Sequence, residues 1–101
     1  MIINIEPSPV KHKRFRVTMD NGKQYDFGLD TGNTYIDHHD KEIRLNYWNR
    51  HYANPTEKRL IDNLVPSPSL FSAYILWGWT TDIYDNIQRL NMLWEKKHGR
   101  K

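Results

Sequence analysis

The sequence contains no cysteine, which excludes disulfide bonds, thiolate zinc sites and cysteine nucleophiles together. Long hydrophobic runs are also missing. The longest apolar stretch lies around residues 70–79 and is far shorter than the roughly 20 residues that a membrane-spanning helix needs. The N-terminus lacks the charged start and apolar core of a secretory signal peptide. We therefore expect neither a membrane span nor signal-directed secretion.

The excess of positive charge is small, and a net charge of +3 permits an anionic partner without requiring one. The cations form two clusters, which are Lys11, Lys13, Arg14 and Arg16 near the start and Lys96, Lys97, Arg100 and Lys101 at the end. Aromatic residues make up 13% of the 101 residues. A few large rings must therefore supply much of the buried area of one small core.

Residues 2–10 alternate weakly between apolar and polar side chains and end in Pro7-Ser8-Pro9, which favours an extended segment. The pattern fits either an arm or an edge strand. The predicted organisation is an extended arm over residues 1–10, a single α+β domain over residues 11–97 and a basic tail over residues 98–101.

Two alternating runs flank Asp20-Asn21-Gly22 and predict a β-hairpin over residues 14–28. A two-residue turn would place the aromatic side chains of the second strand on the face opposite to the apolar side chains of the first. A three-residue loop with Gly22 in the left-handed conformation keeps them on one face. The predicted pairs are therefore Val17 with Tyr25 and Phe15 with Phe27.

The rest of the chain predicts helices separated by proline-containing breaks, so the expected fold class is α+β, an N-terminal β-hairpin followed by three to four short helices. The helices are expected at about residues 38–53, 56–65, 69–77 and 81–97. The predicted caps are Asp37, Thr56, Ser69 and either Thr80 or Thr81, with Gly78 ending the third helix in the left-handed conformation. The last helix should pack an apolar stripe on the core, comprising Ile83, Ile87, Leu90 and Trp94.

Few motifs suggest chemistry. Asp30-Thr31-Gly32 resembles the active-site loop of a retroviral-type aspartic protease subunit, but that family is almost wholly β and the pattern after Asp37 is helical. We interpret the tripeptide as a solvated loop. The histidines lack the helical spacing of a metal pair. We expect no catalytic, cofactor-binding or metal-binding residues, no small-molecule substrate and no enzymatic activity.

Three segments of the sequence resemble one known family. They are the hairpin from Arg16 to Gly28, the helix from His39 to His51, and Ser69-Leu-Phe-Ser-Ala-Tyr-Ile-Leu-Trp-Gly78 followed by Ile83 and Asn86-Ile87. Together they span roughly residues 14–91, and Leu76-Trp77-Gly78 is the most specific piece. The pattern is similar to that of short basic proteins encoded by large icosahedral DNA viruses of algae and protists.

The resemblance implies a non-enzymatic virion component, a minor capsid protein that bridges capsomers on the inner side of the shell. It implies the major capsid protein and other minor capsid proteins as partners, and the host cytoplasm or nucleus as the place of assembly. In this interpretation Trp79 and Trp94 are candidate anchors, and the two basic clusters would contact acidic capsid surfaces or packaged DNA. The alternative is a small basic nucleic-acid-binding module.

Overall fold

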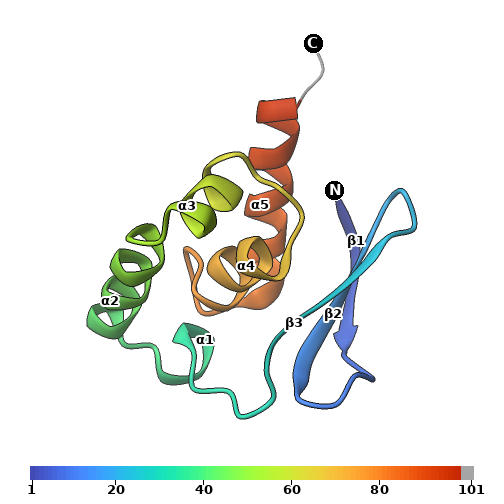
Figure 1. The fold of residues 1–101 in the computed structure, drawn as a ribbon. Helices are drawn as coiled ribbons and strands as arrows, with labels where there is room; N and C mark the ends of the chain where they lie inside the picture. Colours follow the sequence, from blue (N-terminus) through green and yellow to red (C-terminus); the bar gives the residue numbers. More distant parts are fainter. Residues whose placement is uncertain (99–101) are drawn as a thin grey trace.

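The computed structural model describes residues 1–98 and shows a three-stranded antiparallel sheet followed by helices (Figure 1). The strands are β1 (Ile2–Pro7), β2 (Lys13–Met19) and β3 (Gln24–Leu29), in the spatial order β1-β2-β3. The helices are α1 (Tyr35–His38), α2 (Lys41–Tyr52), α3 (Pro55–Asp62), α4 (Pro68–Phe71), the π-helical turn η1 (Ser72–Leu76) and α5 (Ile83–His98). The predicted α+β class is confirmed.

The hairpin has the predicted register. Val17 lies opposite Tyr25 and Phe15 opposite Phe27, so the apolar side chains share one face of the sheet. Gly22 has a φ of 89° and donates its N–H to the carbonyl oxygen of Met19. The left-handed glycine therefore sets the loop length that puts the aromatic residues of both strands on the core side.

The first residues of the chain are part of the sheet. β1 pairs with β2 along its length, and the side-chain amide of Asn91 on α5 binds both the N–H and the carbonyl oxygen of Ile2. Residues 2–7 are therefore an edge strand tied to the last helix, which replaces the arm expected over residues 1–10. Pro7 has no N–H to offer and ends this edge.

Two helices begin at prolines that were predicted to lie between helices. α3 starts at Pro55 with Asn54 as its cap, and α4 starts at Pro68 with Ser67 as its cap. Proline is favoured at the first helical position, because its missing N–H would have no partner there. The caps predicted at Thr56 and Ser69 are therefore wrong by two residues.

The caps of the other two long helices also differ from the prediction. Asp40 accepts hydrogen bonds from the N–H groups of Glu42 and Ile43 and starts α2, three residues after Asp37. α5 follows Asp82, whose carboxylate accepts from the N–H groups of the next turn, so neither Thr80 nor Thr81 caps it. In both cases the N-cap is the aspartate that immediately precedes the first helical residue.

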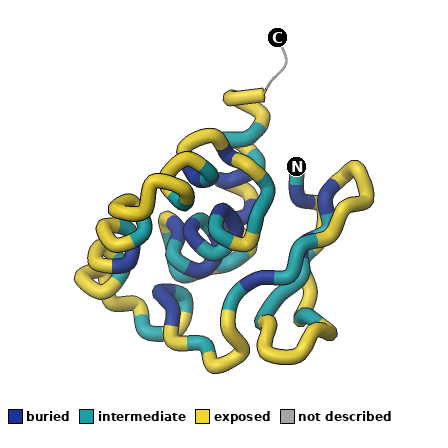
Figure 2. Tube along the Cα trace, viewed as in Figure 1, coloured by how far each residue is buried: buried dark blue, intermediate teal, exposed yellow. Residues whose placement is uncertain are grey.

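The core lies between the sheet and the helices, with α4 and η1 at its centre (Figure 2). Phe71 on α4 contacts the rings of Tyr25 and Phe27 and so joins helices to sheet. The apolar stripe of α5 packs on this core as predicted, with Ile83, Ile87, Leu90 and Trp94 all in contact with it. A smaller second cluster comprises Tyr47, Ile61 and Ala73. Trp77 packs against both clusters, which is the core role.

Candidate functional site

Two of the four predicted strand cations are used by the fold itself. The guanidinium of Arg14 donates two hydrogen bonds, of 2.8 and 2.7 Å, to the carboxylate of Asp37. Arg16 donates two of 3.0 and 3.1 Å to the carboxylate of Asp26. Lys11 and Lys13 are exposed and make no ion pair within residues 1–98. Only these two lysines of the cluster remain available to a partner.

Asp37 holds the connection between sheet and helices in place. Its carboxylate accepts hydrogen bonds from the N–H and the hydroxyl of Thr34, which forms the capping box of α1, as well as those of Arg14. The hydrogen bonds from Arg14 lower the pKa of Asp37 well below its usual range, against the opposing effect of burial. The hydrogen bond from Arg16 likewise lowers the pKa of Asp26.

This pairing predicts a loss of stability in acid. A carboxyl whose pKa is lowered by folding stabilises the fold above the ordinary aspartate pKa of about 3.9, and this contribution is lost as pH falls. In the Asp37→Asn variant the free energy of unfolding should therefore fall less steeply than in the wild type as the pH is lowered. Urea unfolding measured between about pH 7 and pH 2 tests this. Parallel pH profiles for the two proteins would contradict it.

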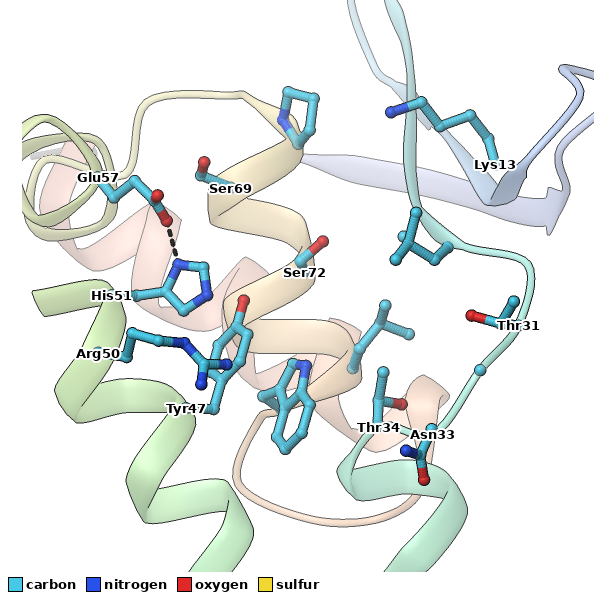
Figure 3. Close-up of a pocket in the computed structure, with 16 residues that line it drawn as sticks. Lys13, Thr31, Asn33, Thr34, Tyr47, Arg50, His51, Glu57, Ser69 and Ser72 are labelled. Carbon is cyan, nitrogen blue, oxygen red and sulfur yellow. Dashed lines mark hydrogen bonds and ion pairs between the residues drawn. The ribbon is translucent and has the colours of Figure 1, made fainter. Parts of the chain in front are cut away.

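A cleft of about 590 Å³ opens between the β3–α1 connection on one side and α2, α4 and η1 on the other (Figure 3). Lys13 extends toward it from β2, and Arg50 from α2. Ser69 and Ser72 lie along its helical wall, and Thr31 and Asn33 along the opposite one. The cleft therefore brings Lys13 together with residues from four helical elements, α2, α3, α4 and η1.

Most polar side chains in the cleft can donate a hydrogen bond, and Lys13, Arg50 and Trp77 can only donate. Its one carboxylate, that of Glu57, is paired with Nδ1 of His51. Burial raises the pKa of Tyr47, so its phenol stays neutral and keeps its proton. Within residues 1–98, the phenol of Tyr47, the indole N–H of Trp77 and the guanidinium of Arg50 have no hydrogen-bond partner. The arrangement suits a ligand rich in acceptors.

A second feature is a row of four aromatic rings, which we call the aromatic strip and which comprises Tyr52, Trp48, Tyr74 and Trp79. The ring centroids of successive members lie 5.7, 5.3 and 4.9 Å apart. The end members, Tyr52 and Trp79, are each 38% exposed. The strip thus runs from α2 across η1 to the turn before α5.

The strip is held rigidly by hydrogen bonds to the domain. The indole N–H of Trp48 donates to the carbonyl oxygen of Trp77, and the hydroxyl of Tyr52 donates to Asp62. In contrast, the indole N–H of Trp79 and the hydroxyl of Tyr74 have no partner within residues 1–98. Fixed rings with free donors are typical of surfaces that bind proteins.

The predicted C-terminal residues are divided by the structure. Lys96 and Lys97 are exposed on α5 and line a hollow of about 330 Å³ together with Tyr74 of the strip. Trp94 is half-buried against the core and contacts the ring of His98, so part of its surface is used by the fold. Arg100 and Lys101 lie outside the described residues.

Sequence reasoning missed three members of the strip, Trp48, Tyr52 and Tyr74. Of the two cleft cations it missed Arg50, whereas Lys13 was among the predicted cations. The spacing of Trp48 and Tyr52, four residues apart on one helix, was a usable signal that two rings share a face. Nothing in the sequence shows that Lys13 and Arg50 line the same cleft, because that depends on how the sheet and the helices pack around α4 and η1.

No helix within residues 1–98 has the length and apolar character needed to cross a membrane. In the same part of the chain, no three histidine or carboxylate side chains gather in a way that could hold a metal ion.

Comparison with protein families gives one match. Residues 3–51 match the model of a family of unknown function (DUF5754), which is just under half of the chain. The matched part runs from β1 almost to the end of α2 and includes Lys13, Arg50 and His51. The helices that contribute Tyr74, Trp77 and Trp79 lie beyond it. No curated protein and no solved structure matches the chain.

Proposed function

We propose that this protein is a non-enzymatic structural component of a large DNA virus particle, a minor capsid protein that bridges larger shell proteins. The observation that carries the proposal is the aromatic strip, a fixed and partly exposed row of tryptophan and tyrosine rings on a small domain. The viral setting rests on the resemblance of the hairpin, the His39–His51 helix and the Leu76-Trp77-Gly78 element to the viral family.

The strip has the chemistry of an interface anchor. Tryptophan and tyrosine dominate binding energy at protein interfaces, and rings already fixed in the free protein lose little conformational freedom on binding. Lys96 and Lys97 border the strip beside Tyr74. The partner surface should therefore have an apolar projection with acidic residues at its rim, as the predicted contact with acidic capsid surfaces requires.

Four of the described aspartates have structural roles. Asp26 and Asp37 are paired with arginines, while Asp40 and Asp82 cap helices. His51 is bonded to Glu57, but neither Ser69 nor Ser72 is hydrogen-bonded to it, so the nucleophile and base of a hydrolase are not assembled there. These side chains stabilise the domain in ways that do not require a substrate.

The test is the binding of a Trp79→Ala variant to purified shell protein and its incorporation into particles. Removing an exposed hot-spot tryptophan should weaken binding by about 2 kcal/mol or more, roughly thirtyfold, with the fold intact. Tyr84→Ala is the matched control, because Tyr84 is an aromatic residue on α5, is 68% exposed and lies outside the strip. It should bind and be incorporated like the wild type.

Three results would overturn the proposal. The first is a folded Trp79→Ala protein that is incorporated normally, and the second is a wild-type protein that leaves particles in high salt. The third is tight binding to duplex DNA, as the alternative nucleic-acid module requires. Four neutralised phosphates would give a slope of about −3.6 for log affinity against log salt concentration. With Arg14 and Arg16 paired to carboxylates, the strand should give about half that slope or less.

A further inference from the structure

The cleft beside Lys13 and Arg50 is separate from the aromatic strip and is not explained by docking to a shell protein. Its volume of about 590 Å³ is in the range of small-molecule sites, which is roughly 300–1,000 Å³. Its walls come from β2, the β3–α1 connection, α2 and the α4–η1 segment. A cavity of this kind on a rigid framework can select a ligand by its charge and shape.

Charge in the cleft favours an anion. Lys13 and Arg50 approach from opposite sides, and neither makes an ion pair within residues 1–98. Glu57 is the one carboxylate in the lining and is bonded to Nδ1 of His51, so the two unpaired cations outnumber the carboxylate. Two separate cations suit a group that carries more than one negative charge and several acceptor oxygens, as phosphate does.

The neutral part of the lining adds further donors and an apolar wall. The phenol of Tyr47 and the indole N–H of Trp77 have no hydrogen-bond partner within the described part of the chain. Leu29, at the end of β3, is 66% exposed although it borders the cleft, and Leu76 lies in the same lining. An organic group bound in the cleft would cover Leu29.

We propose that this cleft binds an organic phosphate of nucleotide size. The phosphate lies between Lys13 and Arg50, and the organic part lies against Leu29 and Leu76. Tyr47 and Trp77 donate hydrogen bonds to the ligand's acceptors. The site is independent of the aromatic strip, so a protein that fails to bind shell protein can still bind this ligand.

The experiment is calorimetric titration of the full chain with adenosine monophosphate, with adenosine as the matched neutral ligand and citrate as an anion without phosphate. Saturable binding of adenosine monophosphate is expected, with adenosine and citrate each at least about tenfold weaker. Arg50→Gln and Lys13→Gln should each weaken adenosine monophosphate binding by about tenfold or more while the circular dichroism spectrum stays unchanged.

Lys11→Gln is the control variant, because Lys11 is an exposed cation near Lys13 but outside the cleft lining. It should bind adenosine monophosphate like the wild type. The proposal fails if no ligand saturates the protein, if adenosine binds as tightly as its phosphate, or if citrate does. It also fails if Lys11→Gln weakens binding as much as Lys13→Gln, since that result would mean unspecific attraction to a basic surface.

Discussion

Replacing Gly78 by alanine is expected to destabilise the domain strongly. A Cβ at this position would lie 2.0 Å from the carbonyl oxygen of Tyr74 and 2.8 Å from Cγ of Asn86. The carbonyl belongs to η1, which cannot move away because Ile75 and Leu76 are fully packed in the core. We therefore expect a loss above the range of about 1–3 kcal/mol that ordinary overpacking costs. Urea unfolding followed by far-ultraviolet circular dichroism measures it.

Gly22→Ala is the matched control for this prediction. Position 22 also requires glycine, because its φ is 89°. A Cβ at this position would have no other atom within 4 Å, so no steric clash is expected. The expected loss is about 1 kcal/mol, the cost of placing alanine in the left-handed region. A Gly78→Ala protein as stable as Gly22→Ala would show that the turn after η1 relaxes freely, which contradicts the steric argument.

Gly78 was predicted to end the third helix in the left-handed conformation, but the structure requires glycine at this position for a different reason. A glycine at the end of an apolar helix usually takes the left-handed conformation, but Gly78 does not. It is needed because η1 widens the end of the helix and brings the Tyr74 carbonyl against it. A π-helical turn depends on tertiary packing and has no local sequence pattern that separates it from an α-helix.

The sheet was predictable because its information is local. The alternation of Phe15 and Val17 with polar residues, and the Gly22 loop, fix register and face together, so the pairs with Tyr25 and Phe27 followed directly. β1 was harder. Its apolar pattern is weak, and its place depends on Asn91, which lies 89 residues away in the chain.

Helix starts were predicted less well because two signals compete at the same place. A proline after a polar residue can end one segment or begin the next, and Asn54-Pro55 and Ser67-Pro68 do the second. The candidate cleft could not be predicted at all. Lys13 belongs to β2 and Arg50 to α2, and they line the same cleft only through the tertiary arrangement of the sheet and the helices.

Asn86→Ala should be the most damaging change of a polar side chain in the domain. Asn86 is fully buried, and its amide uses every hydrogen-bonding position. Nδ2 donates to the carbonyl oxygens of Ile75 and Thr80, at 2.9 and 2.8 Å, and Oδ1 accepts from the N–H and hydroxyl of Thr80. Alanine leaves these backbone groups without a hydrogen-bond partner. Each of them that stays buried lowers the free energy of unfolding by about 1–3 kcal/mol. A total loss of about 3–5 kcal/mol is expected in urea unfolding.

Asn91→Ala is the matched control, because it removes another asparagine of α5 without removing the buried hydrogen bonds of Asn86. Asn91 also makes two backbone hydrogen bonds, but to Ile2 on the edge strand, where water can replace a lost amide. Its loss should cost about 1–2 kcal/mol. Asn86 also lies against Gly78, since a Cβ on Gly78 would come within 2.8 Å of its Cγ. Equal losses of unfolding free energy for Asn86→Ala and Asn91→Ala would contradict the prediction that the buried hydrogen bonds of Asn86 are the more costly to remove.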